Sequence, residues 1–381
     1  MNTPPFPTSR SAVRSRPDGI HGAPLLLAFA LLGAACSSEA PAPTPDQIYA
    51  GIVAEARHTA ASPGLSAAVA VDGELVWSGG SGLADVENDV PATAMSVYRI
   101  ASISKPLAAT AVMQLVERGQ IDLDAPIQEY FPFPEKSHPV TTRHLLTHTS
   151  GIRHYNPGEF DMKDHFDSVE AAMEIFQDDP LLFEPGADYS YSTYAYNILA
   201  GIVETVSGVS FDRYMRENIW SPAGMDASFL EHQGDLVSHR VRQYVKSEEP
   251  EGVRNAPFAD LSIKWAGGGM IASAPDLVRF ALALDAGMLL GDDAQAEMTT
   301  PYVLTGGTTS DYALGWRIAE DDLGTWVAHS GGATGGSTHL LRLPGRGLAV
   351  ALTANVQDGG GLPDAARQLA EAALATADAA E

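Results

Sequence analysis

The chain has 381 residues, of which 45% are hydrophobic and 19% are charged, as in a globular protein with a large core. Its 23 Lys and Arg residues stand against 48 Asp and Glu residues, which gives a formal net charge of −25. This charge argues against nucleic acid or another polyanion as a partner. The single cysteine, Cys36, excludes a disulfide within the chain.

Residues 1–36 are typical of a targeting segment. Basic residues precede a short apolar run over 24–35, which is too short to span a bilayer comfortably. The run ends at Cys36 in Leu-Gly-Ala-Ala-Cys, which resembles a bacterial lipobox. We therefore expect an exported lipoprotein that is anchored to the membrane through Cys36 and faces the periplasm or the cell exterior. Cleavage by the ordinary signal peptidase is the alternative.

Residues 37–45 are rich in proline and predict an extended tether. Apolar residues at helical spacing then predict a helix over 46–60 that begins at Asp46 as its N-cap. Two strand-like runs, 65–71 and 74–78, flank the Asp-Gly pair at 72–73 and predict a β-hairpin.

The remaining elements are predicted from apolar periodicity and turn residues. The expected helices are a buried one over 107–118, a short one over 143–151 closed by glycine, and three over 169–176, 197–206 and 211–220. The polar stretch 246–255 is expected to be a surface loop. Strand-like runs return at 326–330, 337–343 and 348–354, and an alanine-rich helix over 363–377 closes the chain.

Strands therefore lie at both ends of the chain and helices fill its middle. The expected fold is α/β (α+β): one antiparallel sheet built from both chain ends, flanked by helices, with an inserted helical lobe at about 121–261. One domain over 46–378 would hold both parts. We expect Ser102 to lie at a cleft between the sheet and the lobe.

Ser102 and Lys105 form a Ser-x-x-Lys motif at the start of the predicted buried helix. Residues three apart share a helical face, so the hydroxyl and the amine would be held together. The N-terminus of a helix also favours an anion. This arrangement suits a nucleophilic serine that is activated by a desolvated lysine. The spacing alone is weak, because chance gives one such match about one time in three.

A serine of this type needs two further elements, one with a tyrosine or serine and one on a strand that lines the cleft. Tyr191, in the sequence Tyr-Ser-Thr, precedes an apolar helix. His329 opens His-Ser-Gly-Gly on a predicted edge strand. The Gly-x-Ser-x-Gly elbow of α/β-hydrolases is absent from the chain.

Together these motifs resemble the serine β-lactamase-like hydrolases, which include class C β-lactamases, D-peptidases and esterases. Within this family they are similar to the mitochondrial serine β-lactamase-like proteins and their bacterial relatives. The matching stretches, in family order, are 99–105, 143–155, 191–193, 264–269 and 329–332. The resemblance implies a β-lactamase/transpeptidase-like fold and a covalent acyl-enzyme, with no cofactor and no metal.

The resemblance also implies roles for individual residues. Ser102 would be the acylated nucleophile, Lys105 would accept its proton, and Tyr191 would share the role of base. The N–H groups of Ser102 and Gly332 would form the oxyanion hole. The implied substrate-binding positions are Thr193, His329, Ser330 and Gly331. Because a lysine ammonium is not a base, the pKa of Lys105 must be depressed.

Two positions depart from the β-lactamase pattern. Thr193 replaces an asparagine whose amide grips the substrate, and His329 replaces a lysine that helps to hold the substrate carboxylate. Arg153 and Lys264 are candidate replacements for the lost cation. Both departures favour an esterase, amidase or peptidase acting on a small-molecule or peptide substrate over an efficient penicillin hydrolase.

Other interpretations stay open. The fold could serve as a non-catalytic, filament-forming or peptidoglycan-binding scaffold, so self-assembly is possible. His144 and His148 are four residues apart and could ligate zinc in a metallohydrolase, although no third ligand is evident. Tyr191 could pack on the lobe, and His329 could be structural.

Overall fold

The structure, a computed structural model, describes residues 42–248 and 252–379. The chain divides into two units, Met1–Ala42 and Pro43–Glu381, and the second unit holds the elements given below. The predicted export segment, Cys36 and most of the predicted tether lie outside the described residues. In the described ranges, no helix is long and apolar enough to cross a bilayer.

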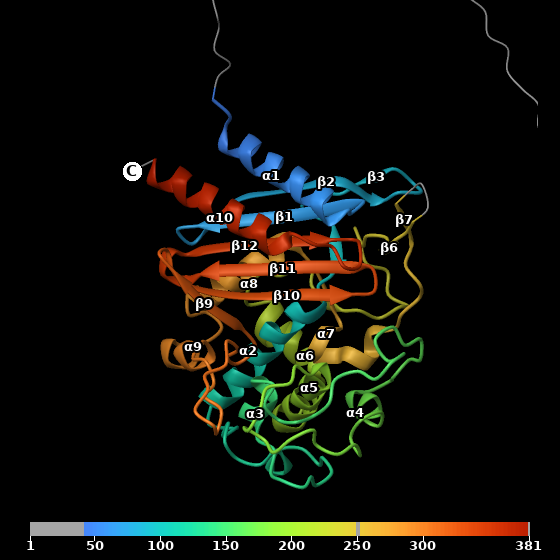
Figure 1. The fold of residues 1–381 in the computed structure, drawn as a ribbon, viewed down its shortest axis with the longest axis vertical. Helices are drawn as coiled ribbons and strands as arrows, with labels where there is room; N and C mark the ends of the chain where they lie inside the picture. The colour runs from blue at the N-terminus through green and yellow to red at the C-terminus, as the bar shows by residue number, and fades with distance from the viewer. Residues whose placement is uncertain (1–41, 249–251, 380–381) are drawn as a thin grey trace, which may run out of the picture. The chain divides into compact units, whose positions relative to one another are not determined.

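A seven-stranded antiparallel sheet joins the two ends of the chain in the order β3-β2-β1-β12-β11-β10-β9 (Figure 1). Its strands are β1 (Gly64–Val71), β2 (Glu74–Asp85), β3 (Val90–Pro91), β9 (Arg317–Asp321), β10 (Gly324–Ala333), β11 (Gly336–Leu343) and β12 (Leu348–Ala354). The N-terminal hairpin meets the C-terminal strands where β1 pairs with β12, with Leu65 opposite Ala354. The prediction of one sheet built from both chain ends is confirmed.

Helices cover both faces of this sheet. α1 (Pro45–Ala60) and α10 (Leu362–Asp378) lie together on one face, and α8 (Ala274–Asp285) lies behind the other (Figure 1). β1 and β12 are buried along their whole length. Such burial is expected of strands that are covered on both sides.

Alternation along β1 divides the interior into two cores. Leu65, Ala67 and Val69 pack with residues of α1 and α10. Ala68 and Ala70 point the other way and join the larger core, which extends through α8 into the helical lobe. The sheet is thereby fixed to the lobe by continuous apolar packing.

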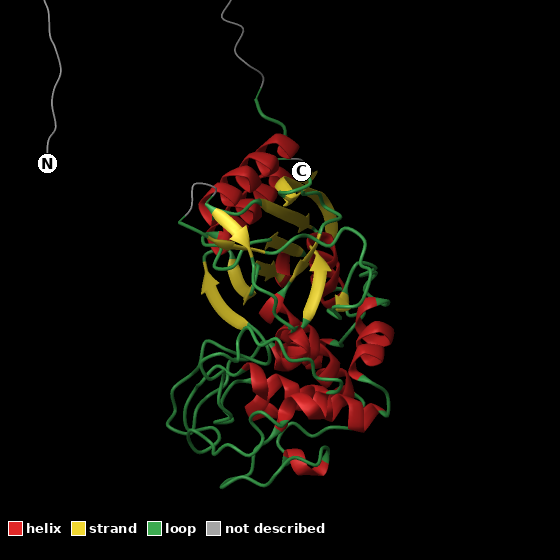
Figure 2. Ribbon diagram, turned by 90° about the vertical axis from the view of Figure 1, so that its right-hand side faces the viewer, coloured by secondary structure: helices red, strands yellow, loops and turns green. Residues whose placement is uncertain are grey.

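The lobe lies beyond the sheet and is mainly helical and looped (Figure 2). Its central helices are α2 (Ser104–Glu117) and α5 (Thr193–Ser207), which contact each other and are mostly buried. The other helical elements of the unit are η1 (Ala101–Ile103), η2 (Ile127–Glu129), α3 (Thr142–Leu146), α4 (Val169–Met173), α6 (Phe211–Met215), the π-helix η3 (Arg216–Trp220), η4 (Leu261–Lys264), α7 (Trp265–Gly268), α9 (Asp292–Met298) and η5 (Pro344–Arg346).

The unit also contains two small sheets. β8 (Met270–Ser273) pairs with β4 (Val97–Arg99) on one side and with β5 (Phe229–Leu230) on the other. β6 (Tyr244–Lys246) pairs with β7 (Val253–Asn255). The prediction of a simple loop over 246–255 is therefore wrong, because its two ends form an antiparallel pair.

Two predicted helix ends are also wrong, for local reasons. α1 begins at Pro45 because Thr44, not Asp46, is its N-cap and forms a capping box with Gln47. α3 ends at Leu146, so Gly151 lies beyond the helix and does not close it.

The most useful unpredicted element is β9, which pairs with β10 only as far as Ala328. Residues 329–333 of β10 therefore have β11 on one side and, in the described part of the chain, no strand on the other. This free edge contacts the η1 turn that carries Ser102.

Candidate active site

Ser102 lies in the η1 turn, between β4 and α2, and is half-buried. The sequence predicted it in the first turn of the long helix, but that helix begins two residues later. The free edge of β10 packs closely on the turn at Gly331. A Cβ there would collide with the carbonyl oxygen of Ile100 and lie 3.0 Å from the nitrogen of Ser102. Glycine therefore permits this approach.

Lys105 follows in the first turn of α2 and is 0% exposed. Its Nζ lies 3.2 Å from Ser102 Oγ, 3.2 Å from Thr193 Oγ1 and 2.6 Å from the carbonyl oxygen of Gly267. Burial, together with the charge of Lys264, lowers the pKa of Lys105 well below its usual value. The amine is thereby favoured in its neutral form.

The surroundings of the Lys105 amine also allow that neutral form, although an ammonium could donate to all three neighbours. A neutral amine has two N–H donors and one lone pair. The Gly267 carbonyl accepts one N–H and the Thr193 hydroxyl accepts the other, which leaves the lone pair for the Ser102 hydroxyl. This arrangement can take the proton of Ser102.

Tyr191 comes from the loop before α5 and approaches Lys105 from the lobe. The centre of its ring lies 4.7 Å from Lys105 Nζ and 4.2 Å from the centre of the His148 ring. Burial raises the pKa of Tyr191 above its usual value, although interaction with Ser102 opposes the shift. The phenol therefore stays protonated and can donate or relay a proton.

Thr193 is the first residue of α5 and is held from two sides. Its N–H donates to His154 Nδ1 at 3.1 Å, while its hydroxyl accepts from Lys105. A Cβ at Gly267 would collide with Thr193. The glycine therefore lets the chain before β8 approach α5 closely enough for its carbonyl to reach Lys105.

A cavity of about 170 Å³ opens beside Ser102. Its lining includes four residues that were predicted as site residues, namely Ser102, Tyr191, Thr193 and Gly332, and also Lys264 and His154. A Cβ added at Gly332 would meet nothing within 4 Å, so this residue faces open space. The structure thus brings together residues that are 230 positions apart.

His329 was predicted to bind substrate but does not line the cavity. It is 4% exposed, with Nδ1 2.7 Å from the carbonyl oxygen of Ser330 and Nε2 2.9 Å from the hydroxyl of Tyr312. Because a carbonyl only accepts, Nδ1 carries the proton and Nε2 accepts from Tyr312. Burial lowers the pKa of His329 to about 3, so its ring is neutral.

The two residues after His329 also lie outside the cavity lining. The Ser330 hydroxyl lies 2.8 Å from His339 Nδ1, and Gly331 packs on the Ser102 turn. The strand therefore presents the backbone around Gly332 to the cavity.

Comparison with known proteins identifies the family. Residues 50–374 match the family described as Beta-lactamase. The chain is 30% identical over 440 residues to "Serine beta-lactamase-like protein LACTB, mitochondrial" from Homo sapiens, covering 85% of this chain and 80% of that protein. This chain belongs to the beta-lactamase family.

The relatives in this family are named after different hydrolytic activities. "Esterase EstB" from Burkholderia gladioli is 32% identical over 253 residues, covering 57% of this chain and 64% of that protein. The structure of D-amino acid amidase from Ochrobactrum anthropi SV3, complexed with L-phenylalanine amide, has a TM-score of 0.76 and 25% identity, covering 87% of this chain and 99% of that one. The predicted family and the β-lactamase/transpeptidase-like fold are confirmed. This serine hydrolase family includes esterase, peptidase and amidase homologues.

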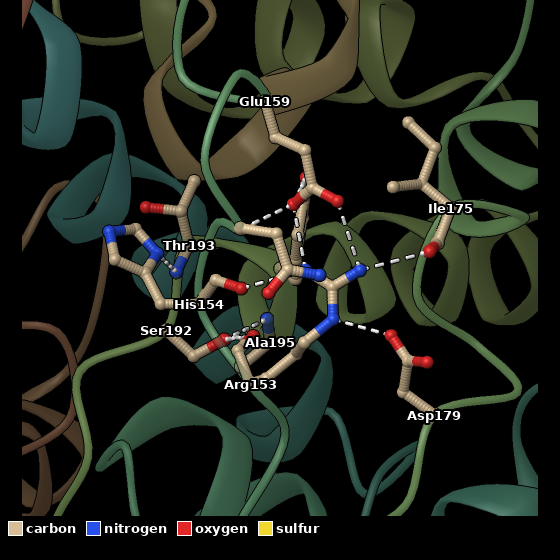
Figure 3. A network of polar contacts seen from close by, with 10 residues as sticks. Arg153, His154, Glu159, Ile175, Asp179, Ser192, Thr193 and Ala195 are labelled. Carbon is tan, nitrogen blue, oxygen red and sulfur yellow. Dashed lines mark hydrogen bonds and ion pairs between the residues drawn. The ribbon is translucent and has the colours of Figure 1, made fainter.

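Arg153 was a candidate replacement for the lysine that β-lactamases carry at the His329 position. Figure 3 shows its guanidinium between two carboxylates. It forms ion pairs with Glu159 and Asp179 and also donates to the carbonyl of Ile175. These contacts neutralise the charge of Arg153, and Arg153 does not line the cavity. Of the two candidate cations, Lys264 is the one that lines it.

His144 and His148 each use Nδ1 to accept a backbone N–H, from Thr141 and Ser192 respectively. His148 is fully buried beside the ring of Tyr191, and burial lowers its pKa well below the usual value. Over 42–248 and 252–379, no group of three or more His, Cys, Asp or Glu residues is arranged to hold a metal ion. His148 instead supports the turn that carries Tyr191.

Two features of the site were missed from the sequence. The carbonyl of Gly267 binds Lys105, and the imidazole of His154 binds the start of α5. Both lie within stretches that carried the family resemblance, at 264–269 and 143–155. Every residue has a backbone carbonyl, so the type of residue does not indicate which carbonyl binds Lys105. The only indication in the sequence was that Gly267 lies inside a stretch that matches the family.

Proposed function

We propose that this protein is a serine hydrolase that cleaves an ester or amide bond through a covalent acyl-enzyme on Ser102. The observation that carries the proposal is the buried Lys105 amine, 3.2 Å from Ser102 Oγ. Among the described residues, no carboxylate lies within ion-pair distance of this amine. A lysine in such surroundings is suited to act as a base.

Acylation follows from these contacts. The proton of the Ser102 hydroxyl passes to the Lys105 lone pair as Oγ bonds to the substrate carbonyl carbon. The N–H groups of Ser102 and Gly332 are the proposed donors to the oxyanion. The intermediate then expels the leaving group, which takes a proton from the Lys105 ammonium through the Tyr191 hydroxyl.

Deacylation uses the same groups in reverse. Water gives a proton to Lys105 as its oxygen bonds to the acyl carbon. The bond between that carbon and Ser102 Oγ breaks, and Ser102 recovers a proton. The acid product leaves, and Lys105 is neutral again.

The substrate proposed is an ester, amide or peptide, and penicillin hydrolysis is expected to be slow. The Thr193 hydroxyl is engaged by Lys105, and it offers no amide to the substrate. His329 is buried and neutral, so it supplies no cation to a substrate carboxylate. Rapid turnover of nitrocefin by the purified protein, abolished in Ser102→Ala, would contradict this assignment.

A fluorophosphonate probe tests the nucleophile directly. We expect it to label wild-type protein on the peptide that contains Ser102, as identified by mass spectrometry. Ser102→Ala should lose the label, while Ser330→Ala should keep it, because Ser330 is exposed and outside the cavity lining. Absence of labelling in folded wild-type protein would overturn the proposal.

Export and lipid attachment at Cys36 form a separate proposal, which rests on the sequence of residues 1–36. Expression of the full chain in a bacterial host should place it in the membrane fraction, and Cys36→Ala should release it. An unmodified Cys36 in the mature protein would contradict lipidation. Self-assembly and peptidoglycan binding stay predictions from the family resemblance.

A further inference from the structure

Lys264 is a second buried lysine beside Ser102, and no step of the proposed reaction passes a proton to or from it. It is the last residue of η4, three positions before the Gly267 carbonyl that binds Lys105. Lys264 is 3% exposed, and it lines the cavity. Its Nζ donates to the carbonyl of Phe160 and lies 4.0 Å from the centre of that ring and 5.3 Å from the centre of the Tyr155 ring.

The charge of Lys264 is unpaired among the residues that the structure describes. Across the described ranges, no carboxylate lies within ion-pair distance of its Nζ. Glu231 is a nearby buried acid, and it is paired with Arg99 at 2.7 Å. Asp161 is exposed on the surface. Because an unpaired buried cation is costly, the site as it stands favours an incoming anion.

Lys264 also lies close to the reacting serine. A Cβ at Gly268 would lie 3.7 Å from Lys264 Cδ and 3.7 Å from the carbonyl carbon of Ala101, the residue before Ser102. One glycine therefore separates the lysine stem from the Ser102 turn. The cavity that both residues line has a volume of about 170 Å³, which is small for a ligand site. Its volume is sufficient for a short acyl group.

We propose that Lys264 binds a carboxylate at the far end of a short acyl group, so that the protein hydrolyses esters or amides of short dicarboxylic acids. The inference rests on the proposed serine-hydrolase function and adds the class of acyl group. The acyl group stays on Ser102 after the leaving group departs. A nearly inaccessible cation is therefore placed to hold the part of the substrate that remains inside.

The preference for an anionic acyl group should depend on pH. Burial lowers the pKa of Lys264 to about 7. Below that pH Lys264 is a cation and attracts the carboxylate; above it the amine is neutral and the preference falls. The charged or titratable groups that face or influence Lys264 are Arg99, Lys105, His154, Tyr155, Asp161 and Glu231.

These neighbours leave Lys264 as the group that sets the selectivity near pH 7. Burial lowers the pKa of His154 to about 4 and raises that of Tyr155, so both rings are neutral in this range. Glu231 is paired with Arg99. Lys105 acts on charged and neutral substrates alike, so its titration cancels in the ratio of their kcat/KM values.

The test uses 4-nitrophenyl monoesters of succinic, glutaric and adipic acids. Each is compared with the 4-nitrophenyl alkanoate of matching length, and the background measured with Ser102→Ala is subtracted. At pH 6 we expect kcat/KM for at least one monoester to exceed that for its neutral partner by about tenfold or more. A difference of this size corresponds to one charge-assisted hydrogen bond. Within the Lys264→Met variant this preference should disappear, so that the charged and neutral esters of matching length have equal kcat/KM values.

Lys136→Met is the matched control. Lys136 also donates to backbone carbonyls, at Gln177 and Asp179, and lies 5.3 Å from the centre of the Phe133 ring. It does not line the cavity, so its replacement should leave the preference unchanged. If Lys264→Met does not fold, the wild type provides a second measurement. Glutarate should slow fluorophosphonate labelling of Ser102, whereas glutaramide should not.

Three results would overturn the inference. They are equal kcat/KM values for charged and neutral esters, a preference that survives in folded Lys264→Met, and a preference only for esters that carry the carboxylate on the leaving group. In each case wild-type hydrolysis and Ser102 labelling would still support the proposed function. Loss of all hydrolysis and labelling would instead refute the serine-hydrolase proposal itself.

Discussion

The two walls of the cavity contribute in different ways. The wall from the helical lobe supplies side chains: the amine of Lys105, the phenol of Tyr191 and the hydroxyl of Thr193 all converge on Ser102 or on one another. The wall from the sheet is the free edge of β10. Its polar side chain at His329 points to a structural partner, Tyr312, and Gly332 lines the cavity.

The lobe wall therefore supplies the reacting groups, and the sheet wall supplies the structural support for the cavity. A side chain on the lobe wall acts through its functional group, so its removal should lower activity with little effect on folding. The sheet wall acts through the position of its backbone. Substitutions there should alter stability or the space available to substrate. Substitutions on each wall test this division.

The largest effect is expected on the lobe wall, at Lys105. Lys105→Met removes the base and should lower kcat/KM for an activated ester by roughly 10³-fold. The melting temperature should hold or rise, because the substitution also removes a buried amine. Activity within tenfold of wild type in the folded variant would show that Lys105 is not the base.

On the sheet wall, two adjacent glycines should respond in opposite ways. Gly332→Ala adds a methyl group to open space in the cavity, so stability should hold while activity falls by about 10²-fold through displacement of the substrate. Gly331→Ala forces the methyl group into the Ser102 turn and should destabilise the protein by about 1–3 kcal/mol.

Thermal unfolding and ester hydrolysis of the two glycine variants separate these effects. A Gly332→Ala variant with full activity would mean that the sheet edge does not border the bound substrate. A Gly331→Ala variant with unchanged stability would mean that the Ser102 turn can move away from β10.

The sequence was sufficient to predict the architecture for a physical reason. The Asp-Gly turn at 72–73 and the buried strand patterns near both chain ends determine local structure through short-range rules. Sheet pairing between the ends then follows from the need to bury both sets of strands. The same rules failed for β9 and for the pair β6–β7, whose strands are short and largely exposed.

The site was predicted less completely. Ser102, Lys105, Tyr191 and Thr193 carry recognisable side chains in ordered motifs, and they converge in the structure. The His329 ring is directed toward Tyr312, whose hydroxyl it binds. The sequence patterns did not indicate that Tyr312 is a neighbour of His329. When both faces of a sheet are covered by other elements, the position of a residue along its strand does not identify the hydrogen-bond partner of its side chain.

A smaller effect is expected for Thr193, which holds Lys105 without taking part in bond formation. Thr193→Val removes one acceptor of the Lys105 amine and should lower kcat/KM by about tenfold or less, as loss of one hydrogen bond suggests. Thr193→Ser keeps the hydroxyl and is the matched control. Equal losses in the two variants would assign the effect to packing against Gly267 instead.

The smallest effect on activity is expected at His329. His329→Phe removes the acceptor of the buried Tyr312 hydroxyl, which should lower the free energy of unfolding by about 1–3 kcal/mol. Activity of the folded variant should change by less than about threefold, because the ring lies outside the cavity lining and the proposed base is on the opposite wall. Chemical denaturation and ester hydrolysis measure the two quantities.

Tyr312→Phe completes a double-mutant cycle for this contact. If the His329–Tyr312 hydrogen bond accounts for the loss of stability, the double variant should be less destabilised than the sum of the single variants. A large loss of activity in folded His329→Phe, with little loss in Tyr312→Phe, would instead assign His329 a direct role with substrate. The division between the two walls would then fail at this residue, because a side chain of the sheet wall would take part in binding or chemistry.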